Sequence, residues 1–360
     1  MASFRLYRPI MVQNKGLFYK AHPSGMPVLG KDLVLETHEF DENQTPPSGG
    51  ITAKINYVSF DPYQRGRMRP AEVKSYTPAF KLNEPITNDA IITVLKSDND
   101  KFKPGQTLHT DSANTEEYIV MDKKAADACR VLNNPYNLDP KMFLGPLGMP
   151  GLTAYSSFYE IGQPVKGETV FISAASGAVG QIVGQLAKHR GLKVIGSVGD
   201  DKKLEFITKD LKFDGGFNYK KEKPLDALRR LAPQGIDIYF ENVGGEQLEA
   251  ALTQMNDHGR IIACGMISQY NKPPDQQYGI KNLMYVVSKR IRLQGFIVFD
   301  PNFGPKYFQE HQKNVQEWLH DGTFKAQLCV TQGIDHAGQG LLDIFEGKNF
   351  GKAILEVAKL

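Results

Sequence analysis

The segment from Val170 to Gly184, VFISAASGAVGQIVG, joins an apolar run to a helix-like run through a series of small residues. Its first residues are typical of a buried strand, and the apolar spacing from Gln181 onward is typical of a helix. A tight strand-to-helix turn gathers free backbone N–H groups and the positive end of the helix dipole, which suits a diphosphate. Gly177 and Gly180 would allow close approach of phosphates and close packing of the helix. Because Ala174 stands where the first glycine of the dinucleotide fingerprint usually lies, the segment alone also fits a non-nucleotide α/β protein.

The next segment, KVIGSVG (193–199), predicts a second strand at the expected distance. The acidic pair at 200–201 would either hold ribose hydroxyls or cap the following helix. In the second case Lys203 lies in the first turn of that helix, and Tyr219 begins a third strand after it. A lysine and a phenol that converge there suit a 2′-phosphate and favour NADP(H) over NAD(H). The alternative is that Lys202 and Lys203 are solvated surface charges.

Charge and composition exclude several classes of function. The formal net charge of +3 is too small and too dispersed to favour nucleic acid or an anionic membrane. No apolar run approaches the roughly 20 residues that span a bilayer, and the N-terminal MASFRLYRPI lacks the apolar core of a signal peptide. Three scattered cysteines (Cys129, Cys264 and Cys329) and eight dispersed histidines argue against a metal site, and we interpret the histidines as surface or capping residues. We therefore expect a cytoplasmic protein without a metal.

Two patterns of expected secondary structure divide the chain into domains. Residues 1–145 hold short alternating runs separated by Pro and Gly turns, which predicts a mostly antiparallel, barrel-like β domain. Residues 146–319 alternate strands with helices, which predicts an α/β domain with a doubly wound parallel sheet of the Rossmann kind. Residues 320–360 return to short strands around one helix, and the run Lys352–Val357 is expected to rejoin the first domain.

The strands expected in the central domain number six, matching two mononucleotide halves. They are Thr169–Ser173, Lys193–Ser197, Gly216–Asn218, Ile236–Glu241, Arg260–Ala263 and Arg292–Val298. In the first domain the clearest runs are Asp32–Thr37, Gly50–Phe60, Ala90–Leu95 and Glu117–Met121. A helix over Lys306–Leu319 is expected to pack through an apolar stripe.

Several longer motifs carry a family resemblance. They include VSFDPYQRGRM (58–68), GMPGLTAY (148–155), FNYK (217–220), YFENVGGE (239–246), CGMISQYN (264–271) and NFGKAILEVA (349–358). On these the chain resembles the zinc-independent medium-chain dehydrogenase/reductases, and among them the leukotriene B4 12-hydroxydehydrogenase, prostaglandin reductase and plant-type alkenal double-bond reductase family. The resemblance implies a homodimer, a GroES-like catalytic domain built from residues 1–145 and 320–360, and a central Rossmann domain over 146–319. It also implies NADPH-dependent reduction of a carbon–carbon double bond conjugated to a carbonyl, with a small-molecule substrate.

Such a reaction needs a donor to the developing enolate oxygen and a proton for the α-carbon. Tyr270 follows a strand end, where doubly wound sheets place ligands, and the resemblance puts a tyrosine there near the nicotinamide ribose and the substrate carbonyl. It is our first choice as hydrogen-bond donor or acid, against the alternative of a loop tyrosine that only packs on a neighbour. Tyr63 resembles a tyrosine of the substrate pocket, on a loop that Pro62 stiffens; the alternative is a structural turn. Arg65 and Arg67 would either bind an acidic substrate tail or, as is more usual for arginine, be solvated or paired with Glu.

The remaining cofactor contacts rest on the turn pattern and the resemblance. Asn242 would hydrogen-bond cofactor hydroxyls, Cys264 would pack against the cofactor, and the backbone of Phe296, Ile297 and Val298, at the end of the last strand, would hold the carboxamide. The full expected set for NADPH/NADP+ is Pro62, Met149, Thr153, Ala175, Ser176, Gly177, Ala178, Val179, Gly180, Gly199, Lys203, Tyr219, Asn242, Cys264, Ser268, Tyr270, Phe296, Ile297, Val298 and Asn349.

One segment departs from the family pattern. Where relatives carry two flexible glycines, this chain reads ITNDAI from Ile86 to Ile91. We expect a loop here near the substrate, so substrate preference is not inherited from the resemblance. Two other functions stay open: a zinc-free quinone reductase on the same fold, and a catalytically silent nucleotide-binding protein.

Overall fold

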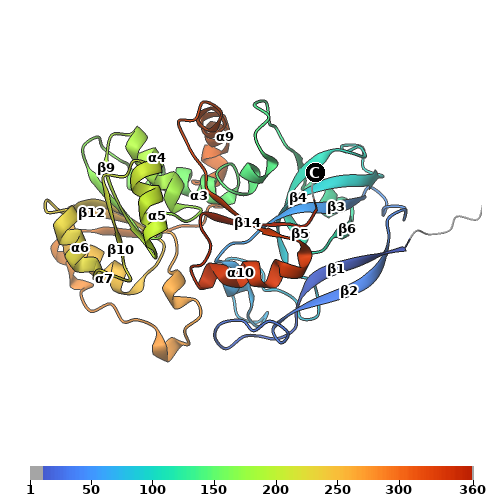
Figure 1. Cartoon of the computed structure of the whole chain (residues 1–360), viewed down its shortest axis with the longest axis horizontal. Coiled ribbons are helices and arrows are strands. Elements are labelled where there is room, and N and C mark those ends of the chain that lie inside the picture. Colours follow the sequence, from blue (N-terminus) through green and yellow to red (C-terminus); the bar gives the residue numbers. More distant parts are fainter. Residues whose placement is uncertain (1–10, 359–360) are drawn as a thin grey trace, which may run out of the picture.

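A parallel sheet forms one half of the molecule (Figure 1). The computed structural model describes residues 11–358, so the N-terminal segment singled out above lies outside the described residues. The strand order is β10-β9-β8-β11-β12-β13, which is the doubly wound order of a Rossmann domain and confirms the predicted fold class. Its strands are β8 (Thr169–Ile172), β9 (Lys193–Val198), β10 (Gly215–Asn218), β11 (Ile236–Glu241), β12 (Met255–Ala263) and β13 (Arg292–Gly295).

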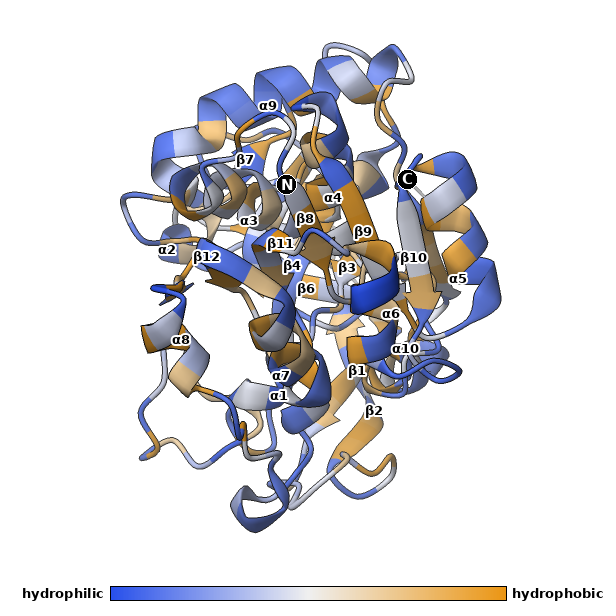
Figure 2. Ribbon diagram, turned by 90° about the vertical axis from the view of Figure 1, so that its left-hand side faces the viewer, coloured by the Kyte–Doolittle hydropathy of each residue, from blue (hydrophilic) through white to orange (hydrophobic). Residues whose placement is uncertain are grey.

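Helices cover this parallel sheet because each parallel crossover returns through one (Figure 1). They are α3 (Met149–Ser157), α4 (Gly180–His189), α5 (Asp201–Glu205), α6 (Pro224–Leu231), α7 (Gly245–Gln254), α8 (Met284–Ser288) and α9 (Gly304–His320). Figure 2 shows apolar strands inside and polar helix faces outside. In the core, the rings of Phe171 and Tyr239 stack with centroids 4.8 Å apart, and Ile182, Val183 and Leu186 of α4 pack onto the sheet.

The other half is built on a mostly antiparallel sheet with the order β14-β15-β3-β4-β5-β7, in which β6 also pairs with β3. Its strands are β3 (Ile51–Ser59), β4 (Thr87–Ser97), β5 (Thr107–Asn114), β6 (Tyr118–Met121), β7 (Arg130–Val131), β14 (Leu328–Gln332) and β15 (Lys352–Glu356). A separate hairpin joins β1 (Met11–Tyr19) to β2 (Leu33–Asp41), and the helices are α1 (Gln64–Arg67), α2 (Lys123–Asp127) and α10 (Ala337–Phe345).

The C-terminal segment returns to this second sheet. β15 pairs antiparallel with β3, with Leu355 opposite Val58, which confirms the expectation for the run from Lys352. In Figure 1 α10 lies between the parallel sheet and the β1–β2 hairpin. The chain therefore crosses from one half to the other twice. Segments that are far apart in the sequence meet where the two halves face each other. The exact predicted boundaries at 145 and 320 stay predictions.

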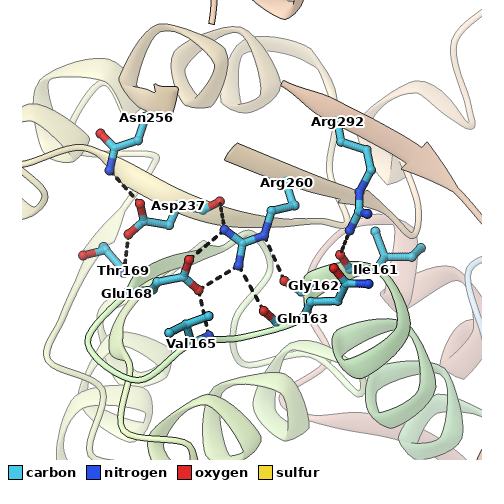
Figure 3. Close-up of polar contacts among 10 residues, drawn as sticks. All are labelled: Ile161, Gly162, Gln163, Val165, Glu168, Thr169, Asp237, Asn256, Arg260 and Arg292. Atoms are coloured by element: carbon cyan, nitrogen blue, oxygen red, sulfur yellow. Dashed lines mark hydrogen bonds and ion pairs between the residues drawn. The ribbon is translucent and has the colours of Figure 1, made fainter. Parts of the chain in front are cut away.

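Arg260 fastens the edge of the parallel sheet where β8 begins (Figure 3). Its guanidinium donates to both carboxylate oxygens of Glu168, at 2.8 and 2.7 Å, and to the main-chain oxygens of Gly162 and Gln163. Beside it, Asp237 accepts from the backbone N–H of Thr169 at 2.8 Å. These bonds lie at the amino ends of the strands, opposite the edge where a doubly wound sheet binds ligands.

Three sequence expectations need correction. The segment 86–91 is not a loop: β4 begins at Thr87 and pairs with β5, with a register shift between Asn88 and Ala90. The last parallel strand ends at Gly295, so residues 296–298 follow the strand rather than end it. Two histidines are core residues rather than surface residues, since His109 and His311 are 6% and 0% exposed.

No helix among the described residues is both long and apolar enough to cross a membrane. All three cysteines are free, with Cys129 buried and the others partly exposed.

Candidate active site

A cavity of about 480 Å³ lies between the two halves. The carboxyl ends of β8, β9, β11 and β12 supply one wall, and the segment after β3, together with residues 344–353, supplies the other. Both tyrosines and every residue of the expected cofactor set line this cavity except Ala175. Ala175 is fully buried and donates its backbone N–H to Ser197 at 2.9 Å, so it packs the turn from behind and its prediction as a cofactor contact is wrong.

The turn between β8 and α4 has the shape that a diphosphate needs. The N–H of Gly177 donates to the carbonyl of Ala174 at 2.9 Å, and α4 then begins at Gly180. A Cβ on Gly180 would lie 2.5 Å from that carbonyl oxygen, so only glycine fits there. Ala174 has φ +48°, which explains why glycine is usual at its position. The amino-terminal end of this ten-residue helix lies beside the cavity, and the positive end of its dipole suits an anionic group.

At the far end of the cavity, Asp200 accepts the backbone N–H of Lys203 at 2.9 Å. Asp200 is thus the cap of α5, which confirms the capping alternative and places Lys203 in the first turn. Lys203 is 7% exposed, and its ammonium donates to the carbonyl of Gly347 at 2.7 Å, whereas Lys202 is exposed. The surface-charge alternative therefore holds for Lys202 and fails for Lys203.

Tyr219 lines the same end of the cavity as Lys203. A Cβ on Gly199 would lie 2.9 Å from the Tyr219 hydroxyl oxygen, so the glycine leaves room for the phenol. Burial raises the pKa of Tyr219, and the nearby Asp200 adds to the rise. Lysine and neutral phenol are both hydrogen-bond donors, and both line this end of the cavity with Gly199.

Tyr270 follows the short helical turn Ile267–Gln269, a few residues beyond the end of β12. Its hydroxyl oxygen accepts the backbone N–H of Met266 at 3.1 Å, which leaves the phenolic proton available for another partner. Burial, with smaller contributions from Cys264 and Tyr76, raises the pKa of Tyr270 to about 12. The phenol is therefore neutral at physiological pH and keeps a proton that it can donate.

Tyr63 lies in the opposite wall, at the start of α1. Burial raises the pKa of Tyr63, and the carboxylates of Asp89 and Asp61 add to the rise. A second neutral phenol thus faces the same cavity. The two tyrosines come from segments more than 200 positions apart, and only the fold brings them to one site.

A buried polar network holds the turn that carries Tyr63. Asp61 accepts from the Ser59 hydroxyl at 2.5 Å, and its backbone N–H donates to Gln64 at 3.2 Å. The Gln64 amide in turn donates to Ser59 and to Asn88, and Asn88 donates to Thr115 at 2.7 Å. Asn88 belongs to the segment that departs from the family pattern, so this departure supports the Tyr63 turn from behind rather than lining the cavity.

Asn242 and Cys264 follow β11 and β12 at the cavity wall. Asn242 donates its side-chain N–H to the Ser173 carbonyl at 2.7 Å and its backbone N–H to the Ser173 hydroxyl at 2.9 Å. Beneath it, buried Glu241 accepts the N–H groups of Val243 and Gly244, which shapes the turn. Burial raises the pKa of the Cys264 thiol to about 12, which disfavours the thiolate that a nucleophilic cysteine needs.

The other predicted residues also line the cavity. Met149 and Thr153 come from α3, with the Thr153 hydroxyl 3.4 Å from the Met149 sulfur. Residues 296–298 follow β13, and Asn349 donates to the Gly351 carbonyl at 2.8 Å. Ser268 donates its hydroxyl to Val243 at 2.5 Å.

The arginines of the segment 65–69 do not line the cavity. Arg67 donates to the main chain and hydroxyl of Thr87 and to the Pro78 carbonyl, and its guanidinium lies 4.1 Å from the centre of the Phe80 ring. Arg65 donates to Asn271 and to two main-chain carbonyls. With their donors committed, neither is placed for an acidic substrate tail, and that expectation is wrong.

Some cavity residues gave no signal in the sequence. Tyr76 and Phe299 line the cavity although they are 61% and 62% exposed, and both come from irregular segments. Lys352 and Gly347 also line it, from the chain that returns late to the site. Only the NFGK motif pointed to that region, and it identified Asn349 but not Lys352.

One group of side chains in the described part has donor atoms spaced for a metal ion: Asp89, His109 and Asp111, within 4.8 Å of one another. It does not line the cavity. Arg130 donates to His109 at 2.8 Å and to Asp111 at 2.9 Å. Two of the three groups therefore already bind the Arg130 guanidinium. The expectation of a metal-free protein stays a prediction.

Known proteins resemble the chain over nearly its whole length. Residues 178–316 match the family described as zinc-binding dehydrogenase, and residues 15–128 match the N-terminal domain of oxidoreductase. The NADP-dependent oxidoreductase RED1 of Cochliobolus heterostrophus is 54% identical over 97% of this chain and 99% of its own. The NADP(+)-dependent 2-alkenal reductase of Nicotiana tabacum is 40% identical over 97% of this chain and 98% of its own. The crystal structure of CurA from Vibrio vulnificus in complex with NADPH superposes with a TM-score of 0.87 at 31% identity, over 96% of this chain and 100% of that one.

Proposed function

Because the chain belongs to the zinc-independent medium-chain dehydrogenase/reductases, in the family of NADP-dependent alkenal double-bond reductases, we propose that it reduces the carbon–carbon double bond of α,β-unsaturated aldehydes and ketones. It is an NADPH-dependent oxidoreductase, and the substrate class is the part that we propose. The observation that carries the proposal is the pair Tyr270 and Tyr63, two neutral phenols in opposite walls of one cavity. The glycine-containing turn between β8 and α4 lines the same cavity.

NADPH bound in this cavity supplies the hydride that the β-carbon of the substrate accepts. The turn before α4 would hold the diphosphate, and Lys203 with Tyr219 would hold the 2′-phosphate, which favours NADPH over NADH. The Lys203 ammonium would then exchange its bond to Gly347 for the phosphate, a stronger charge-assisted partner.

The protein's part in the reaction is to stabilise negative charge on the carbonyl oxygen of the substrate. Tyr270 is suited to this because its oxygen is already held by the Met266 N–H and its proton is free to be donated. A neutral donor in a partly dehydrated cavity stabilises a developing enolate oxygen more than it stabilises the ground-state carbonyl. Tyr63, from the other wall, would orient the substrate carbonyl or help to deliver the proton that the α-carbon accepts.

The walls around the two phenols favour an uncharged substrate. Tyr76 and Phe299 add aromatic surface, and the arginines of the Tyr63 segment have their donors committed elsewhere. A carboxylate-bearing substrate would leave its charge without a partner in this part of the cavity. We therefore propose an aryl or alkyl enone or enal, acted on by a homodimer in the cytoplasm.

The test is oxidation of NADPH and NADH by the purified protein against an alkenal, an aryl enone, a quinone and a saturated aldehyde, with products identified by mass. A saturated carbonyl product with NADPH preferred is the expected result. Turnover of the quinone alone would replace the proposal by quinone reduction. Tight binding of NADPH with no turnover of any compound would mean that the fold has kept its cofactor and lost its reaction.

A further inference from the structure

A hydrogen bond joins the segment that carries Tyr63 to the segment that carries Tyr270. The Arg65 Nε donates to the side-chain oxygen of Asn271 at 2.8 Å. The same guanidinium donates through Nη2 to the carbonyls of Gly25, at 2.8 Å, and Pro23, at 3.2 Å. Asn271 also donates to the sulfur of Met26 at 3.3 Å. Three segments far apart in the sequence therefore meet at one guanidinium.

The position of this contact gives it a consequence for the site. Arg65 lies two residues after Tyr63 in α1, and Asn271 directly follows Tyr270. Arg65 belongs to the half built on the antiparallel sheet, and Asn271 lies between β12 and β13 of the parallel sheet. Neither residue lines the cavity, so neither is placed to touch substrate or cofactor.

The other hydrogen bonds of the segment that carries Tyr270 lie within its own wall, while Ile267 packs against the apolar core of the other half. Ile267 and Ser268 donate their backbone N–H groups to Asn242 and Val243, and Tyr270 donates its own to Ile267. Within residues 11–358, the hydrogen bonds that tie this segment to the other wall are those of Asn271 with Arg65 and Met26. Since the first has a charged donor and is half-buried, it is the stronger of the two.

We propose that Arg65 is a positioning residue, which clasps Asn271 across the two halves and thereby fixes the Tyr270 hydroxyl relative to Tyr63. This inference rests on the proposed function and deepens it. The enolate oxygen must lie within hydrogen-bonding distance of a donor from one wall while the other wall orients the carbon skeleton. A relative shift of the walls by about 1 Å is enough to cost on the order of 100-fold in rate.

Asn271 is the better residue to vary, because Arg65 also supports the turn at 23–25. Asn271→Leu removes the acceptor at similar volume, and Asn271→Asp keeps an acceptor oxygen for the guanidinium. We expect Asn271→Leu to lower kcat by about 10-fold or more, with the dissociation constant for NADPH within about 2-fold of wild type. Asn271→Asp should restore most of kcat, which a merely structural role of the amide would not allow.

Hydrogen–deuterium exchange gives a readout that does not depend on the reaction. Peptides covering 266–272 should exchange faster in Asn271→Leu and at the wild-type rate in Asn271→Asp. Unchanged exchange in Asn271→Leu would overturn the clasp whatever the substrate is. Wild-type kcat in Asn271→Leu, or equal loss in both variants, would overturn the positioning role. Failure of the wild-type protein to reduce any enone would instead contradict the proposed function, and the exchange result would still decide on the clasp.

Discussion

The ammonium of Lys352 lies 2.7 Å from a carboxylate oxygen of Asp61, and both side chains are buried. The same ammonium donates to the carbonyl of Phe60 at 2.6 Å. Lys352 begins β15, and Asp61 opens the turn that carries Tyr63. The pair thus joins the last strand, β15, to the turn that carries Tyr63, across 291 positions in the sequence.

Replacing Lys352 by Met should be strongly destabilising. The substitution keeps an apolar side chain of similar length but leaves the Asp61 carboxylate buried without its cation, which typically costs about 3–5 kcal/mol. The measurement is the free energy of unfolding in urea. Asp61→Asn in the same background should recover part of the loss, and Lys209→Ala, at an exposed pair, should change little. A Lys352→Met protein as stable as wild type would show that the pair is not a stabilising contact.

Tyr270→Phe removes only the hydroxyl that we assign to the enolate oxygen. We expect kcat to fall by about 10-fold or more, as for other lost oxyanion donors, while the affinity for NADPH changes little. Steady-state kinetics on an aryl enone and a fluorescence titration with NADPH measure the two quantities. Tyr136→Phe, at an exposed tyrosine outside the cavity lining, is the matched control. An unchanged kcat in Tyr270→Phe would remove this residue from the mechanism.

Local patterns predicted the cofactor side of the site well. The turn between β8 and α4 and the position of Lys203 in the first turn of α5 depend on residues within a few positions of one another. Small residues before an apolar helix, or an aspartate before a short helix, leave few alternatives for the backbone. Ala175 was misassigned because the pattern gives the turn but not which of its residues faces inward.

The substrate side depended on contacts that no local pattern encodes. Lys352 with Asp61 and Arg65 with Asn271 pair residues hundreds of positions apart, and each residue taken alone is typical of an exposed charge or a loop. The family pattern, with glycines at this place, predicts a loop at 86–91, yet Asn88 satisfies its amide in a buried network within β4. His311 lies on the predicted packing stripe of α9, so its burial follows from the helical spacing, whereas its residue type alone favours a surface position.

Lys203→Ala tests the 2′-phosphate assignment. The variant should bind NADPH about 10-fold or more weakly, since it loses a charge-assisted bond to the phosphate. It also loses the bond to Gly347, but that loss affects NADPH and NADH equally. The ratio of the two dissociation constants is therefore the measurement, with exposed Lys202→Ala as the control on the same helix. Equal weakening of both cofactors would place the 2′-phosphate elsewhere.

His311 should make stability depend on pH. Burial lowers the pKa of His311 from 6.5 to about 4, while its ring Nε2 lies 2.9 Å from the Pro146 carbonyl oxygen. Between these values the unfolded chain binds a proton that the folded protein does not. Stability is thus complete above pH 6.5 and falls as the pH decreases toward 4, by about 2 kcal/mol from this residue between pH 7 and pH 5.

Urea unfolding at pH 7 and pH 5 measures this contribution. In His311→Gln, whose amide still offers a donor for the Pro146 carbonyl, the difference between the two pH values should shrink by about 2 kcal/mol. Buried His109, whose pKa is also lowered to about 4, should account for part of what remains. The same difference in variant and wild type would contradict the assignment.

The proposed homodimer has a surface suited to it. Apolar side chains are exposed on α8, where Met284 and Val287 are 72% and 66% exposed, and on β13, where Leu293 is 39% exposed. The two elements adjoin, because the Ile291 N–H donates to the Val286 carbonyl. β13 is also the last strand of the parallel sheet in the described residues, so its outer backbone groups face no strand of that sheet. Such a combination of apolar patch and open edge is typical of a protein interface.

If a second copy covers this surface, light scattering during size exclusion should give twice the chain mass of 40.1 kDa. The double variant Met284→Glu with Val287→Glu should give the single mass, because two carboxylates would then have to be buried in the interface without partners. Val165→Glu introduces the same charge at a side chain that is 60% exposed in the loop before β8, and it should stay dimeric. A wild-type protein of single mass would contradict the homodimer, and a double variant that stays dimeric would move the interface to another face.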